Sequence, residues 1–164
     1  MFKKFMFGLM LGIVCVATLQ AQVPQGTKIQ AYACGEFDIR DETEGRQWGF
    51  YSKVSPSKER GCYEEKYIKA QWGLDTVQAV GKVRYCYGMD GRMKMVITFR
   101  EGFRYQETNV YVGVGTPDGF QPSIYENQFP VEEGPDYVVY DINEIDAIGK
   151  DVYMIVHAVG TIRR

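Results

Sequence analysis

The chain has 164 residues, of which 45% are hydrophobic and 24% are charged, and its formal net charge is −2. This length suits one ordinary domain, and a mildly acidic chain without a basic cluster has no face for nucleic acid. Twelve tyrosines, nine phenylalanines and eighteen glycines favour strands and tight turns.

The first 21 residues have the three parts of a secretory signal. Lys3 and Lys4 form a positively charged start, and an uncharged apolar run follows at 5–19. Ala21 then supplies the small residue that precedes a cleavage point. The apolar run of 15 residues is shorter than the ~20 residues of a membrane-spanning helix. We therefore expect residues 1–21 to be a signal peptide that is removed.

Cys15 offers an alternative, since a lipoprotein signal ends at a cysteine. Small residues precede a lipidated cysteine, whereas Ile13 and Val14 stand at those positions here, which disfavours lipidation. We expect residues 22–164 to form a single domain with no membrane span. Its formal charge is about −4, because Lys3 and Lys4 leave with the signal. The expected location is the periplasm, the cell surface or the medium.

The strongest local signal after the leader is a β-hairpin. Apolar side chains occupy alternate positions in two runs, 83–87 and 93–99, as in strands with one buried face. Asp90-Gly91 lies between them, and this dipeptide favours a turn with positive φ at both central residues. The pattern predicts two antiparallel neighbours.

Further strands are predicted where similar runs are bounded by Gly, Pro and Asp. These runs are Lys28–Cys34, Gln47–Ser52, Glu64–Trp72, Thr108–Val114, Tyr137–Ile142 and Val152–Gly160. No alternation of strands with helices is present, so parallel α/β folds are disfavoured. We predict an all-β protein, a two-sheet antiparallel β-sandwich of about eight strands.

Three cysteines follow the signal: Cys34, Cys62 and Cys86. In an oxidising compartment two of them can pair, and all three pairings are open. A Cys34–Cys62 bridge would close a loop of about 28 residues and stabilise the fold by roughly 3–4 kcal/mol. The alternative is three reduced thiols that pack as small hydrophobes.

The sequence offers few candidate residues for catalysis or metal binding. His157 is the single histidine, and it is either a general base or metal ligand with Glu107 as partner, or a buried hydrogen-bonded side chain. Glu64-Glu65 and Glu132-Glu133 are paired carboxylates, but neighbours on an extended chain point to opposite faces, which disfavours glycoside hydrolysis. No Gly-x-Ser-x-Gly motif is present. We expect no enzyme activity, no cofactor and no metal.

One acidic segment leaves a calcium site open as an alternative. It contains Asp141, Asn143, Glu144 and Asp146, but the spacing differs from that of a calcium loop. A polar turn is the favoured interpretation.

Aromatic side chains are the most plausible binding chemistry, because flat amphipathic rings suit sugars and protein interfaces. Trp48 and Trp72 share strand faces with apolar residues and are expected in the core. Tyr105, Phe120 and Tyr125 lie in or beside polar loops, where binding residues are common. We take these three as the candidate binding residues.

Six short motifs follow one another along the chain in an order that resembles a known module. They are Ala31-Tyr32-Ala33, Arg46-Gln47-Trp48-Gly49-Phe50-Tyr51, Val80-Gly81-Lys82-Val83, Glu107-Thr108-Asn109-Val110-Tyr111-Val112-Gly113, Asn127-Gln128-Phe129-Pro130 and Val152-Tyr153-Met154-Ile155-Val156-His157-Ala158-Val159. The chain is similar to a module of large extracellular bacterial and archaeal surface proteins. Asn109 stands where that family usually has His. The resemblance implies a secreted β-domain and carries over no catalytic residue.

The sequence as a whole predicts an exported, non-catalytic binding or assembly module of the bacterial cell envelope. The expected partner is an envelope or surface protein, or a glycan, and nucleic acid is not expected. A small secreted hydrolase and a structural subunit of a surface protein complex are the alternatives. The sequence leaves the oligomeric state open.

Overall fold

The computed structural model describes residues 26–39, 49–59, 63–72, 76–116, 128–143 and 145–162, without the side chains of Trp72 and Thr76. Ten strands form this part of the chain. They are β1 (Lys28–Ala33), β2 (Phe37–Asp38), β3 (Phe50–Val54), β4 (Glu64–Trp72), β5 (Thr76–Tyr87), β6 (Met93–Phe99), β7 (Phe103–Gly113), β8 (Glu132–Glu133), β9 (Tyr137–Ile142) and β10 (Val152–Ile162).

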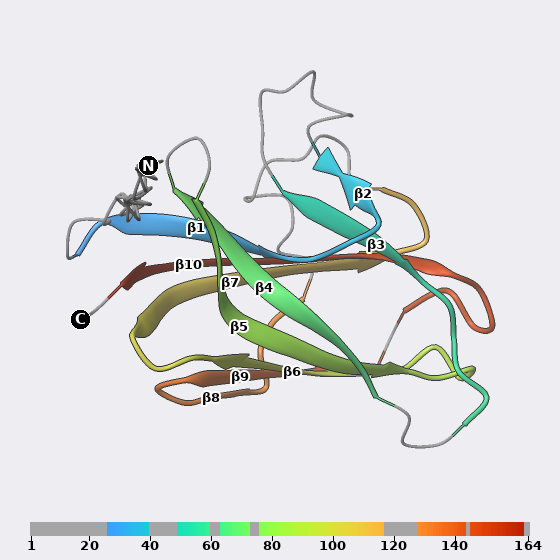
Figure 1. Ribbon diagram of the computed structural model, residues 1–164. Coiled ribbons are helices and arrows are strands. Elements are labelled where there is room, and N and C mark those ends of the chain that lie inside the picture. Colours follow the sequence, from blue (N-terminus) through green and yellow to red (C-terminus); the bar gives the residue numbers. More distant parts are fainter. Residues whose placement is uncertain are drawn as a thin grey trace, which may run out of the picture.

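Every strand pair is antiparallel, and the strands are joined in the order β2-β3-β10-β1-β4-β5-β6-β9-β8. β10 occupies a central place. One of its edges pairs with β7 along almost its whole length, and the other pairs with β3 near Val152 and with β1 near His157. The first and last strands of the described chain are therefore neighbours (Figure 1).

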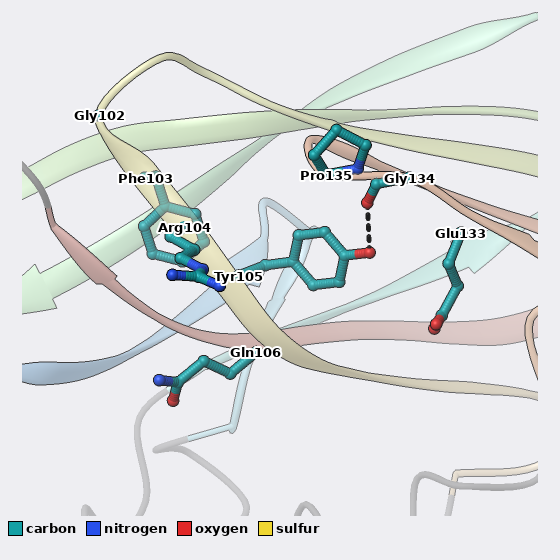
Figure 2. A pocket seen from close by; sticks show the side chains of 8 residues that line it. All are labelled: Gly102, Phe103, Arg104, Tyr105, Gln106, Glu133, Gly134 and Pro135. Atoms are coloured by element: carbon teal, nitrogen blue, oxygen red, sulfur yellow. Dashed lines mark hydrogen bonds between the residues drawn. The ribbon is translucent and has the colours of Figure 1, made fainter.

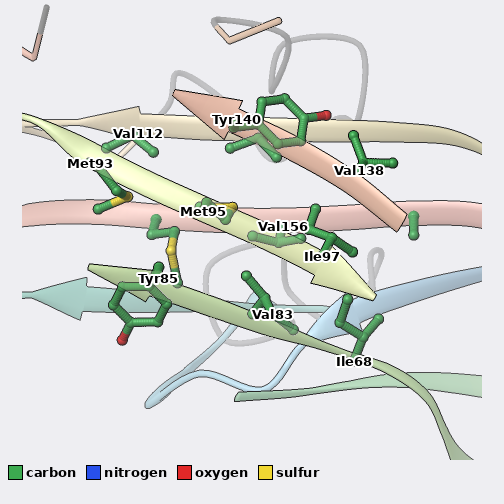
Figure 3. Packing of buried hydrophobic residues seen from close by; sticks show 14 of the residues in the cluster. Ile68, Val83, Tyr85, Met93, Met95, Ile97, Val112, Val138, Tyr140 and Val156 are labelled. Atoms are coloured by element: carbon green, nitrogen blue, oxygen red, sulfur yellow. The ribbon is translucent and has the colours of Figure 1, made fainter. Parts of the chain in front are cut away.

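The sheet folds over on itself, so that β10, β7 and β1 lie opposite β5, β6 and β9 (Figure 1). Buried side chains from both layers meet in one hydrophobic cluster, which Figure 3 shows around Met95, Val83 and Val156. Alternate residues of β6 contribute to this cluster: Met93, Met95, Ile97 and Phe99 are buried, while the residues between them are not. The prediction of an all-β antiparallel fold is confirmed, with the two layers belonging to one continuous sheet.

The predicted hairpin is present as β5 and β6, with a longer connection than Asp90-Gly91 alone suggests. The backbone nitrogen of Gly88 donates to the oxygen of Arg92 at 2.8 Å, and that of Gly91 donates to the oxygen of Gly88 at 3.1 Å. Gly91 has φ of 80°. This is a three-residue loop with glycine in the left-handed position, another common hairpin connection. Asp90 Oδ1 also accepts the Arg92 backbone N–H.

No helix among the described residues is long and apolar enough to cross a membrane. The predicted signal peptide at 1–21 lies outside the described part of the chain, and its removal stays a prediction.

Candidate functional site

A groove of about 640 Å³ runs between the start of β7 and the turn that joins β8 to β9 (Figure 2). Residues 102–106 line one side, and Glu133, Gly134 and Pro135 line the other. The lining combines aromatic rings, one cation, one carboxylate and an amide. Such a mixture suits a ligand that has both polar and apolar groups.

Tyr105 spans the groove and is held at both ends. Its hydroxyl donates to the backbone oxygen of Gly134 at 2.6 Å, as the dashed line in Figure 2 marks. Its ring stacks on Phe99 with 4.7 Å between centroids, and Phe99 in turn contacts Phe103. Burial, reinforced by Glu133, raises the pKa of the Tyr105 phenol, so the hydroxyl stays a neutral donor. The groove therefore has a fixed aromatic floor.

The opposite wall is fixed by a tight turn. The Gly134 backbone nitrogen donates to the oxygen of Tyr137 at 2.8 Å. The Tyr137 ring packs so closely on Gly134 that a Cβ there would collide with it. The Tyr137 hydroxyl donates to Glu132 at 2.7 Å. A glycine is thus required where the ring closes over the turn.

The structure places only one of the three predicted binding residues in the groove. Tyr105 lies in the groove, although it belongs to strand β7 and is half-buried rather than exposed in a loop. Phe120 and Tyr125 lie outside the described residues. The groove residues Arg104 and Gln106 were missed, because the polar run that starts β7 has no clean alternation. Whether Tyr105 contacts a ligand stays a prediction.

His157 lies on the outer face of β10 and is only 1% exposed. It pairs with Tyr32 of β1 on one side and with Asn109 of β7 on the other. The Tyr32 ring lies 4.7 Å from the imidazole between centroids, and Asn109 Nδ2 lies 3.3 Å from His157 Nδ1. Asn109 is therefore the direct neighbour of His157 on the adjacent strand.

The three polar side chains form a chain from the surface inward. Asn109 Nδ2 donates to Glu107 Oε1 at 2.9 Å, so the amide stands between the carboxylate and the imidazole. Burial lowers the pKa of His157 to about 4, and the Glu107 charge offsets only part of this effect. A neutral, enclosed imidazole fits the interpretation of a buried, hydrogen-bonded histidine better than that of a general base.

Around His157, apolar side chains form a second, smaller core. This outer cluster consists of Tyr32, Ile39, Tyr51 and Ile155, with Phe50, Tyr111 and Tyr153 packed against it. Tyr51 comes from β3 and Ile39 follows β2, and both pack with Tyr32 and Ile155 on the outer side of β10. This second core explains why β10 is apolar on both faces.

The paired carboxylates make separate contacts. Glu64 accepts from the Tyr85 hydroxyl at 2.7 Å, while Glu65 forms an ion pair with Lys82 at 2.9 Å. No group of three or more His, Cys, Asp or Glu side chains among the described residues can hold a metal ion. Glu144 of the acidic segment lies outside them.

The outer face of β4 and β5 carries exposed aromatic and basic side chains. Tyr67 is 51% exposed and Tyr63, just before β4, is 46% exposed. The Lys82 ammonium lies 5.2 Å from the centre of the Tyr67 ring, and the Arg84 guanidinium lies 5.2 Å from that of Tyr63. We call this surface, with Lys69 and Lys94, the tyrosine–cation face. Sequence reasoning missed it, although alternate residues of β4 and β5 carry the signal.

Cys34 is half-buried and forms no disulfide among the described residues. Its predicted partner Cys62 lies outside them. The Cys34–Cys62 bridge therefore stays a prediction.

Comparison of the chain with protein-family models, with curated proteins and with solved structures gives no match.

Proposed function

We propose that the chain is an exported, non-catalytic binding module of the cell envelope that holds its ligand in the groove at Tyr105. The groove is the observation that carries the proposal. It is open to solvent, its floor and its opposite wall are fixed by hydrogen bonds, and it presents Arg104, Gln106 and Glu133 beside aromatic rings. Preformed sites of this kind bind with little cost in ordering.

The fit to binding is better than the fit to catalysis. A general base must reach the proton that it removes, and His157 is enclosed. The hydrolase alternative would require the outer cluster to open. Activity that is lost in His157→Ala or Glu107→Gln would favour the hydrolase.

Export is part of the proposal and has its own test. It rests on the leader at 1–21 and on the resemblance to extracellular modules. In that compartment we expect one disulfide, between Cys34 and Cys62, and one thiol. Mass spectrometry of the native protein under non-reducing conditions checks both the cleavage after Ala21 and the bridge. Three reduced thiols would contradict the bridge, and an uncleaved leader would contradict export.

The binding test is affinity purification of the tagged protein from its own envelope, together with a glycan array. The wild-type protein should retain an envelope protein or a glycan, and Arg104→Ala with Gln106→Ala should lose it. Lys53→Gln is the control, because it removes an exposed cation on β3 that does not line the groove. Empty results in both assays would contradict the proposal.

The assembly alternative has one observation in its favour. Among the described residues, the outer edge of β7 from Phe103 to Glu107 pairs with no second strand. An open edge can accept a strand from another protein. However, β7 has a register shift opposite Val159 and Gly160, and exposed charges at Arg104 and Glu107, features that discourage edge pairing. A co-purified complex that survives the groove variant would favour assembly.

A further inference from the structure

The tyrosine–cation face is a second surface, remote in sequence from the groove residues. Tyr63 and Tyr67 are separated by four residues of nearly extended chain, or about 13 Å. Each ring is met by a cation from the neighbouring strand. Rings at this spacing suit an extended polymer better than a small molecule.

The charge of this face differs from that of the whole chain. Four cations, Lys69, Lys82, Arg84 and Lys94, project from β4, β5 and β6. Glu65 compensates Lys82, and Asp141 lies opposite Lys94 across the β6–β9 pair. An excess of positive charge therefore remains on a protein whose formal charge is −2. A local excess of this sign attracts anions.

The strands that carry this face are held rigidly. Their opposite sides contribute Ile68, Ala70, Val83 and Tyr85 to the core, and each of these is at most 1% exposed. β4 and β5 pair along nine positions with one register shift. The outward side chains thus stand on a platform that does not need to reorganise on binding.

We infer that the tyrosine–cation face binds a polyanionic polysaccharide, carboxylated or sulfated. The inference rests on the proposed binding function but not on the groove at Tyr105. The cations lie over the tyrosine rings, where a neutral sugar would stack, so the face favours a ligand that engages ring and cation together. A protein partner fits less well, because lysine is depleted and apolar side chains are enriched at the centres of protein interfaces.

The test is affinity electrophoresis of the folded protein in gels that contain dextran sulfate, polygalacturonate or uncharged dextran. Retardation is expected in the first two gels only. Arg84→Gln and Lys82→Gln should each weaken binding about tenfold, the size of one lost charge-assisted hydrogen bond. Tyr67→Ala should also weaken it.

A matched ion pair elsewhere supplies the controls. Lys53 and Asp151 lie 3.0 Å apart with side chains 49% and 41% exposed, against 2.9 Å, 44% and 41% for Lys82 and Glu65. Lys53→Gln and Asp151→Asn should leave binding unchanged. Glu65→Gln should strengthen it, because the carboxylate competes with the ligand for Lys82.

Three outcomes would overturn the inference: no retardation in dextran sulfate or polygalacturonate, equal loss in Lys53→Gln and Lys82→Gln, or equal retardation in uncharged dextran. Each would leave the proposed binding function standing if the groove variant, Arg104→Ala with Gln106→Ala, still abolishes capture from the envelope. If both capture assays are empty, the proposed function fails as well.

Discussion

The outer faces of the two layers carry similar side chains, which are buried on one face and exposed on the other. On β10 and β1, Tyr32, Ile155 and His157 are nearly inaccessible. Ile39 and Tyr51 pack with Tyr32 and Ile155 in the outer cluster, and the Tyr32 ring lies against His157. On β4 and β5, Tyr63 and Tyr67 stand in solvent beside cations. The same residue types therefore stabilise the fold on one face and are available for recognition on the other. The difference is set by which strands are covered.

The largest expected effect is on the covered face. Ile155→Ala removes a fully buried side chain from the outer cluster and should lower the free energy of unfolding by about 2–5 kcal/mol. Urea denaturation followed by circular dichroism measures it. A loss below about 1 kcal/mol would mean that the outer cluster does not act as a core.

The second effect is pH-dependent and arises from His157. Folding holds its pKa at about 4, below the ordinary 6.5, so the folded state favours the neutral imidazole. The stability that the neutral imidazole gives to the folded state is fully present above pH 6.5. It is lost as the pH falls toward 4, because His157 takes up a proton in the unfolded chain at a higher pH than in the folded one. The free energy of unfolding should fall by about 3 kcal/mol over this range. His157→Gln should flatten this part of the stability profile, and parallel profiles would contradict the assignment.

An intermediate case is Tyr105, which is half-buried between the layers. Tyr105→Phe removes the hydroxyl that donates to Gly134 and should cost about 1 kcal/mol. Thermal denaturation measures the change. If Tyr137→Phe, whose hydroxyl binds the exposed Glu132, costs as much, burial is not what distinguishes the two bonds.

The smallest effect belongs to the open face. Tyr67→Ala should change the free energy of unfolding by no more than about 0.5 kcal/mol, since the ring is 51% exposed. Denaturation of this variant beside Ile155→Ala tests the comparison directly. A cost similar to that of Ile155→Ala would show that the open face is structural.

The alternation of apolar and polar residues was enough to predict the strands that have one buried face. Glu64–Trp72 and Met93–Phe99 match β4 and β6 in the structure. The two-residue strands β2 and β8 were not predicted, because they exist only through pairing with β3 and β9 and have no period of their own. The start of β7 was missed for a related reason: a register shift interrupts the alternation near Tyr105.

The candidate sites were harder to predict because they depend on strand order. Nothing in the local sequence places Tyr32 beside His157, since β1 and β10 come from opposite ends of the chain. Asn109 was located next to His157 by the pairing of β7 with β10. The groove likewise joins residues 102–106 to the Glu133–Pro135 turn, and only the folded layers bring these together.

The central position of β10 has a consequence for how the chain folds. β1, β3 and β7 all pair with this strand, although they lie far from it in the sequence. Folds that depend on distant pairings form slowly. A chain in which β10 has not docked leaves these three strands without their common partner. We therefore expect the layer around β10 to form in one late, cooperative step of folding.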